Sequence, residues 1–174
     1  MLLQGYQERG KRKLTSLSET SGLGKKRIMI VDYSEEESEK IKEMLQNEYE
    51  VFVAKTGVQA LGYLQDKEIP HLILLDLLIP ETHGMDVLKT LKSTPRLRQI
   101  PVIFLTNMDD MALRMEGFGN GGDDFTQKPI HKDLMKLKIR RQLYIAQLEQ
   151  ENQILQLKLQ SLRNRIDRVF DEVF

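Results

Sequence analysis

The run His71–Pro80 constrains the fold of this chain more than any other stretch. It reads HLILLDLLIP, and five of the six residues from Leu72 to Leu77 are apolar. A nearly continuous aliphatic run of this length is typical of a strand buried on both faces of a parallel sheet. Its single acid, Asp76, would lie at the carboxyl edge of that strand, where open α/β sheets place their binding crevices. On this run alone, a carboxylate that merely caps the following loop is an equal alternative.

Four other short segments, three of them apolar, predict further strands of the same sheet. Helical patterns of 10–15 residues separate them, and Ser34 followed by Glu37 is the signature of a capping box at a helix start. This alternation of strand and helix predicts an α/β protein with a doubly wound, five-stranded parallel sheet. The other expected strands are residues 27–32, 51–54, 100–106 and 124–127.

Composition places the chain among globular proteins. Its 174 residues are 40% hydrophobic and 30% charged, which suits one domain with an appendage. No apolar run approaches the roughly 18 residues of a membrane span, and the amino terminus lacks the apolar core of a secretory signal. The absence of cysteine excludes disulfides, thiolate metal sites and cysteine nucleophiles. We therefore expect a cytoplasmic protein without a membrane segment.

The neutral net charge conceals a basic amino-terminal arm. Residues 1–27 hold seven Lys and Arg against two Glu, so they carry +5 and the rest of the chain carries −5. Residues 1–25 are rich in Gly, Ser, Thr, Lys and Arg and show no sustained period, which predicts a flexible arm. Such an arm is more often a solvated lead-in than a binding element, so nucleic acid is not an expected partner.

The ends of the expected strands bring reactive side chains together. Asp32, Asp76, Thr106 and Lys128 end the first, third, fourth and fifth strands, and these ends share one edge of such a sheet. Two close carboxylates favour a cation, and Mg²⁺ prefers oxygen ligands. An aspartate beside Mg²⁺ can attack phosphorus, while a lysine and a hydroxyl stabilise charge on the phosphoryl oxygens. Together the four residues predict a phosphoryl-transfer site.

With these motifs, residues 26–142 resemble the receiver domain of two-component response regulators. The motifs that carry the resemblance are Ile30–Asp32, Leu74–Pro80, Gly84, Pro101–Thr106, Gly121–Phe125 and Lys128–Pro129. The resemblance implies a flavodoxin-like receiver fold. It also divides the chain into a basic arm (1–25), a receiver domain (26–142) and a carboxyl-terminal helix (143–174) that continues the last receiver helix.

The resemblance implies a role for each residue of the site. Asp76 would accept a phosphoryl group from a sensor histidine kinase. Thr106 would bind the phosphoryl group and move on activation, with Phe125 as the aromatic switch. Lys128 would contact the phosphate, and the peptide bond that follows it is often cis in this family.

The expected metal site departs from the family pattern at Tyr33. Mg²⁺ would be held by Asp32, Asp76 and the backbone carbonyl of Leu78. The family usually has an acid, the main metal ligand, at the position of Tyr33. A phenol is neutral near pH 7 and is a poor Mg²⁺ ligand, so metal affinity should fall and phosphotransfer should slow or fail. Rescue by Glu35 or Glu36 is an alternative, although glutamates in a first helical turn are more often solvated.

The helical pattern continues beyond the receiver-like region to the carboxyl terminus. The a positions of its heptads are Lys138, Ile145, Asn152, Leu159, Ile166 and Val173, and the d positions are Leu134, Arg141, Leu148, Leu155, Leu162 and Val169. About four consecutive apolar heptads predict a coiled coil, and hence a homodimer. Asn152 at an a position is a known device for fixing register in a parallel pair. An amphipathic helix folded back on its own domain is the alternative.

The preferred hypothesis is a dimeric receiver module that signals through its coiled coil. Phosphorylation of Asp76 would draw Thr106 and Phe125 inward and change how the last helix packs. An output domain is expected beyond residue 174. A phosphorylation-independent pseudo-receiver scaffold is the first alternative, because Tyr33 replaces an acid, and nucleic-acid binding by the arm is the second. An enzyme acting on a small molecule is not expected, because the phosphoryl site is the only reactive constellation.

Overall fold

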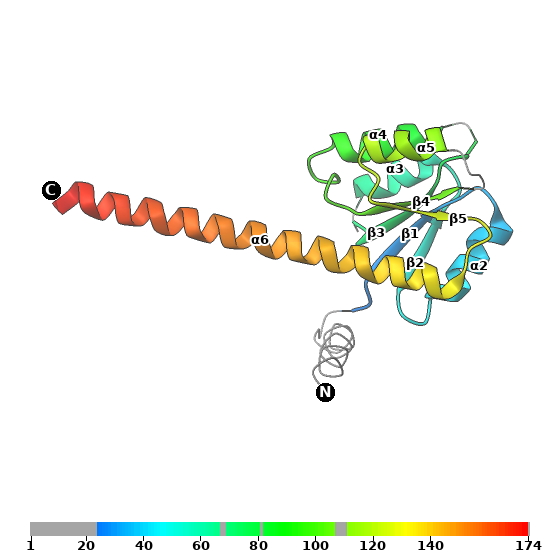
Figure 1. Ribbon diagram of the computed structural model, residues 1–174, viewed down its shortest axis with the longest axis horizontal. Coiled ribbons are helices and arrows are strands. Elements are labelled where there is room, and N and C mark those ends of the chain that lie inside the picture. The colour runs from blue at the N-terminus through cyan, green and yellow to red at the C-terminus, as the bar shows by residue number, and fades with distance from the viewer. Residues whose placement is uncertain (1–23, 67–68, 81, 107–110, 174) are drawn as a thin grey trace.

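A five-stranded parallel sheet forms the centre of the protein (Figure 1). The computed structural model describes residues 24–66, 69–80, 82–106 and 111–173, so residues 1–23 of the predicted arm lie outside it. The strands are β1 (Arg27–Val31), β2 (Glu50–Ala54), β3 (Leu72–Asp76), β4 (Val102–Thr106) and β5 (Asp124–Gln127). They lie in the order β2-β1-β3-β4-β5, and each neighbouring pair is parallel. The predicted doubly wound fold is confirmed.

Helices cover both faces of the sheet, as Figure 1 shows. One face carries α3 (Gly57–Asp66), α4 (Gly84–Ser93) and α5 (Met111–Gly119), and the other carries α2 (Glu35–Leu45) and α6 (Lys132–Val173). Side chains alternate along β3, so that Ile73 and Leu75 lie in the first hydrophobic core and Leu72 and Leu74 lie in the second. Burial on both faces explains why this strand has no polar alternation.

The strand order reverses between β1 and β3. After β1 the chain forms β2 on one side, and then crosses to β3 on the other side of β1. In doubly wound sheets, ligands bind at such a point, in the crevice outside the carboxyl ends of the strands. Asp32 directly follows β1 and Asp76 ends β3. The two acids predicted for the site therefore lie at the strand ends that flank this reversal.

α6 begins as a helix of the domain and continues beyond it. Its first turns bury Met135, Ile139 and Gln142. Every side chain from residue 147 to residue 168 is exposed, and this part of the helix projects away from the sheet in Figure 1. The alternative of a helix folded back on its own domain is therefore wrong. Neither α6 nor any other helix in the described ranges is long and apolar enough to span a membrane.

His71 connects the start of β3 to β1. The imidazole Nδ1 of His71 accepts a hydrogen bond from the backbone N–H of Arg27 (3.0 Å). The backbone N–H of His71 donates to the carbonyl of Arg27 (2.8 Å). Burial, together with the positive charges of Lys26 and Arg27, lowers the pKa of His71. A protonated imidazole carries hydrogen on both nitrogens and cannot accept the bond from Arg27.

We predict that protonation of His71 destabilises the protein in mild acid. An unfolded histidine titrates near pH 6.5, so the unfolded state binds the proton before the folded state does. The free energy of unfolding should fall as the pH drops from about 6.5 toward the lowered pKa of the folded protein. His71→Asn retains an acceptor but does not titrate, so its profile should be flatter. Urea unfolding of both proteins between about pH 7.5 and 5.5 measures this, and parallel profiles would contradict it.

Candidate functional site

The ammonium group of Lys128 holds three carboxylates together at the carboxyl edge of the sheet. Its Nζ donates to Asp32 Oδ2 (2.9 Å), to Asp76 Oδ2 (2.8 Å) and to a carboxylate oxygen of Glu37. Asp32 follows β1, Asp76 ends β3, Lys128 follows β5, and Glu37 lies in the first turn of α2. An ammonium group has three donors, so all three are used here.

Backbone groups fix the two aspartates from their other side. Asp32 Oδ1 accepts from the N–H of Ser34 and Asp76 Oδ1 accepts from the N–H of Leu78, both at 2.8 Å. Each carboxylate therefore has one oxygen on the loop that follows its strand and the other on Lys128. The side chains of Asp32 and Asp76 are buried, whereas that of Glu37 is 41% exposed. The cluster thus has a buried floor and one acid at its rim.

The charges of the site do not balance. Burial acts to lower the pKa of Lys128, but hydrogen bonds to Asp76, Glu37 and Asp32 outweigh it and raise the pKa above its ordinary value. Burial also raises the pKa of Asp32, and hydrogen bonds from Lys128 and Ser34 oppose this only in part, while repulsion from Asp76 adds to it. Counted formally, one ammonium and three carboxylates give the cluster a charge of −2.

Glu37 could not be placed at the site from the sequence. The capping-box pattern predicts that its side chain returns to the N–H of Ser34. Ser34 does cap α2, since its Oγ accepts from the N–H of Glu37 (3.3 Å). The N–H of Ser34, however, is bonded to Asp32, so the carboxylate of Glu37 reaches Lys128 instead.

The two glutamates considered from the sequence as substitutes for Tyr33 lie elsewhere. Glu35 pairs with Lys55 (3.3 Å) and Glu36 pairs with Lys40 (2.6 Å), and both glutamates are largely exposed. Tyr33 itself is 55% exposed. Of the acids that open α2, Glu37 is the one that reaches the cluster.

The other predicted residues border the site. Thr106 ends β4, is buried, and its backbone carbonyl accepts from the N–H of Lys128 (2.8 Å). Leu78 is 51% exposed, on the loop that follows Asp76. The peptide bond between Lys128 and Pro129 is cis. Asn107, next to Thr106, lies outside the described residues.

Phe125 lies on β5, next to two cations rather than in the carboxylate cluster. The guanidinium carbon of Arg114 is 4.6 Å from the centre of its ring, and Lys138 Nζ is 5.0 Å from it. Lys138 also donates to Asp124 Oδ1 (2.8 Å) and to the backbone carbonyl of Phe125. Since Lys138 belongs to α6, this aromatic residue is linked directly to the long helix.

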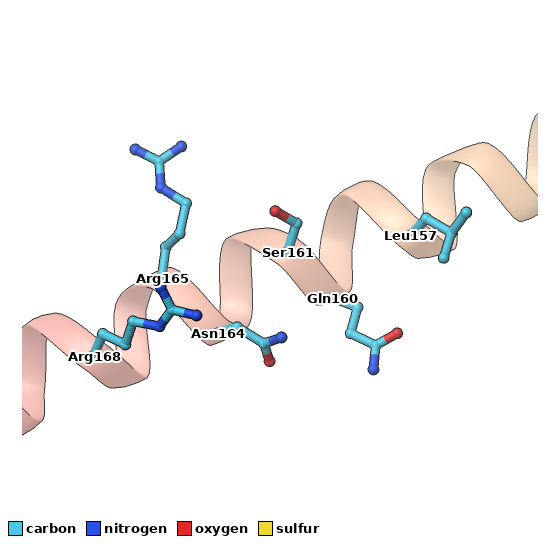
Figure 2. A pocket seen from close by; sticks show the side chains of 6 residues that line it. All are labelled: Leu157, Gln160, Ser161, Asn164, Arg165 and Arg168. Atoms are coloured by element: carbon cyan, nitrogen blue, oxygen red, sulfur yellow. The ribbon is translucent and has the colours of Figure 1, made fainter.

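A shallow depression on α6 is not a second candidate for the functional site. It lies on the projecting part of the helix and is lined by residues of that helix alone, as Figure 2 shows. Side chains of one convex helix cannot surround a ligand, whereas binding sites are concave. Asn152, the predicted register residue, also lies on this exposed part of α6.

Gly84 allows α4 to begin against the strand end that carries Asp76. Its N–H donates to the carbonyl of Leu77 (3.2 Å). A Cβ at this position would lie 2.3 Å from the carbonyl oxygen of Asp76 and 2.6 Å from the Cα of Leu77. Both are backbone atoms, so a side chain could be accommodated only if the chain next to Asp76 moved.

We predict that Gly84→Ala destabilises the protein by about 1–3 kcal/mol, as overpacking typically does. Gly62→Ala is the matched control, because Gly62 lies inside α3 and nothing lies within 4 Å of its added Cβ. Alanine is the better helix former, so this variant should be more stable by up to about 1 kcal/mol. Urea unfolding measures both changes. Equal effects of the two substitutions would show that the contact at Gly84 is not restrictive.

Comparison with known proteins connects this geometry to a family. The response regulator receiver domain family matches residues 28–140. Response regulator PleD of Caulobacter vibrioides is 35% identical over 115 residues, which are 66% of this chain and 25% of PleD. Transcriptional regulatory protein CpxR of Escherichia coli is 35% identical over 130 residues, 72% of this chain and 54% of CpxR. The Mn²⁺-bound form of response regulator Rcp1 is 30% identical, with a TM-score of 0.57 over 64% of this chain and 88% of that one.

The matched region contains the whole carboxylate cluster. It covers residues 28–140, whereas the chain spans only a quarter to about half of the length of the two curated relatives. Receiver domains are signalling modules of two-component systems rather than classical enzymes. They are phosphorylated by histidine kinases and often pair with output domains. Because the family matches most of its length and the fold and the carboxylate cluster agree with that match, this chain belongs to the response regulator receiver family.

Proposed function

We propose that Asp76 is the phospho-acceptor of this receiver and that a sensor histidine kinase is the donor. The observation that carries the proposal is the position of Asp76 at the end of β3, the middle strand of the sheet. Its two neighbours there are β1, which leads to Asp32, and β4, which ends at Thr106. Lys128 donates directly to its carboxylate (2.8 Å). Asp76 is therefore the acid that all the other predicted groups surround.

These side chains account for the protein's part in phosphoryl transfer. An oxygen of the Asp76 carboxylate attacks phosphorus, and a P–O bond forms as the P–N bond of the phosphohistidine breaks. The electron pair of the broken bond returns to the imidazole of the kinase. Lys128, already hydrogen-bonded to Asp76, stabilises negative charge on the phosphoryl oxygens. The hydroxyl of Thr106 binds the transferred group.

The donor set fits Mg²⁺. Ligand oxygens of Asp32, Glu37 and Asp76 lie within 4.8 Å of one another, and Mg²⁺ prefers carboxylate oxygens. Asp32, Asp76 and the backbone carbonyl of Leu78 would hold the ion, which would offset the repulsion between the carboxylates and an incoming phosphoryl group. That Rcp1 has a Mn²⁺-bound form supports a divalent cation here as well.

A phosphorylation-independent dimer scaffold is the second candidate function. Tyr33 favours it, because a phenol stands where the family usually supplies its main metal ligand. In that case Lys128 would serve only as the permanent counter-ion of the buried aspartates. The two functions differ in whether Asp76 reacts.

We predict that the protein takes up one phosphoryl group from acetyl phosphate when Mg²⁺ is present. Intact-mass spectrometry should show a single adduct that disappears when Mg²⁺ is omitted and is absent from Asp76→Asn. If no adduct forms, binding of fluoroberyllate, a stable phosphoryl mimic, tells slow phosphorylation from an inert site. A protein that neither reacts nor binds the mimic would support the scaffold.

The projecting part of α6 supports a homodimer through a coiled coil. Residues 147–168 are all exposed, and an isolated helix of this kind is only marginally stable in water. Apolar side chains that are 36–66% exposed occupy its seam positions, namely Ile145, Leu148, Leu155, Leu159, Leu162 and Ile166. A second copy of the helix would cover them, and Asn152 would fix the register. We infer that this seam transmits the state of Asp76.

The link from Phe125 to α6 supports this transmission. Lys138 contacts the ring of Phe125 and bonds to Asp124 beside it, while being part of the helix that forms the seam. Phosphorylation that draws Thr106 and Phe125 inward would therefore disturb the base of α6 directly. A change of register or rotation in the seam is a two-state element of the kind that signalling requires.

We predict that Leu155→Asp converts a dimer into a monomer. Burial of a leucine contributes at least about 1.5 kcal/mol in each chain, so the dimer should weaken by about a hundredfold or more. Leu157→Asp is the matched control, because Leu157 is also exposed on the same helix (68%, against 58% for Leu155) but lies outside the seam. Sedimentation equilibrium measures both variants. Equal weakening by the two substitutions would place the contact elsewhere on α6.

A further inference from the structure

We propose that Glu37 supplies the carboxylate that the divalent-cation site of this receiver lacks at Tyr33. The proposal rests on the proposed function, because it concerns the same cation. It assigns the third carboxylate ligand, beside Asp32 and Asp76, to the first turn of α2 rather than to the loop that follows β1. The tyrosine at position 33 would then not disable the site, because the acid that the family usually has there is replaced by Glu37, four residues later in the chain.

The position of Glu37 supports this role. One of its carboxylate oxygens lies within 4.8 Å of ligand oxygens of Asp32 and Asp76, and the same carboxylate is bonded to Lys128. Its side chain is 41% exposed, so it approaches from the solvent side, where a hydrated cation would enter. Mg²⁺ retains several waters when it binds to proteins, which suits a site with an open rim.

The local structure of the chain selects this glutamate. Asp32 Oδ1 accepts from the N–H of Ser34 (2.8 Å), and Ser34 Oγ accepts from the N–H of Glu37 (3.3 Å), so two hydrogen bonds fix the first turn of α2 against β1. Because the N–H of Ser34 is already bonded, the side chain of Glu37 does not return to it. Glu36, which directly precedes Glu37, pairs with Lys40 on the outer surface of the helix.

The charge of the cluster supports a divalent ion. Two aspartates with Lys128 would carry −1, whereas the presence of Glu37 makes the charge −2. Each carboxylate has about four lone-pair positions, and Lys128 occupies one on each acid. Free lone pairs thus remain for a metal ion, and a divalent cation would bring the formal charge of the cluster from −2 to zero without an acid at position 33.

Binding of Mn²⁺ to the full chain tests the proposal without relying on phosphorylation. Titration followed by the electron paramagnetic resonance signal of free Mn²⁺ gives the affinity. Glu37→Gln should bind about tenfold or more weakly, a loss typical of altered metal sites, and Glu36→Gln should stay within about twofold of the unaltered protein. Adding Tyr33→Asp to Glu37→Gln should restore binding, because it returns an acid to the position after Asp32. A purely structural role for Glu37 would not permit that rescue.

The outcomes separate this proposal from the proposed function. If Asp76→Asn weakens Mn²⁺ binding but Glu37→Gln does not, the role of Glu37 is overturned while the cation site stands. If the unaltered protein does not bind Mn²⁺ at millimolar concentration, the role of Glu37 and the metal-dependent function both fail. Urea unfolding of Glu37→Gln shows whether the variant is folded. A loss of binding without rescue by Tyr33→Asp, in a folded protein, would also overturn the proposal.

Discussion

The structure of the site depends on one ammonium group among three carboxylates. Asp32 and Asp76 are buried next to each other, and two like charges in a region of low dielectric are costly unless a cation compensates them. Lys128 provides that compensation because β5 lies next to β4 and runs parallel to it. This position brings residue 128 to the same edge of the sheet as residues 32 and 76. The position of Lys128 therefore depends on the strand order, and the burial of the two aspartates depends on Lys128. The proposed phosphoryl group on Asp76 would compete for the same ammonium, so phosphorylation would have to rearrange the interaction that stabilises the unphosphorylated site.

The fold could be predicted from the sequence because burial leaves a strong pattern. A strand such as β3, covered on both faces, must be apolar at every position, and its terminal acid then marks the edge of the sheet. The position of Lys128 followed from the same reasoning, since the edge is shared by every parallel strand. Its partnership with both aspartates is the geometric outcome of that shared edge.

Glu37 could not be predicted, because its position depends on competition for a single N–H group. Ser34 and Glu37 have the spacing of a capping box, and propensity alone directs the glutamate to the helix terminus. The adjacent carboxylate of Asp32 takes that N–H first, and this contact joins two segments whose orientation is defined only in the folded chain. The sequence instead offered Glu35 and Glu36 as substitutes for Tyr33, but the turn of the helix directs them to Lys55 and Lys40. A heptad pattern likewise shows which side chains share a stripe, but not that Gln142 is the last described side chain of the helix to be buried in the domain.

The continuity of α6 has a mechanical consequence. Ion pairs from Lys136 and Arg140 to Glu48 hold its base on one side, and the bond from Lys138 to Asp124 holds it on the other. No Gly or Pro interrupts the 42 residues from Lys132 to Val173, so the helix has no joint along a length of about 63 Å. A tilt of only about five degrees at the base would displace the far end by about 5 Å. Under the proposed function, α6 would therefore convert a small rotation at its base into a displacement of several ångströms at its far end.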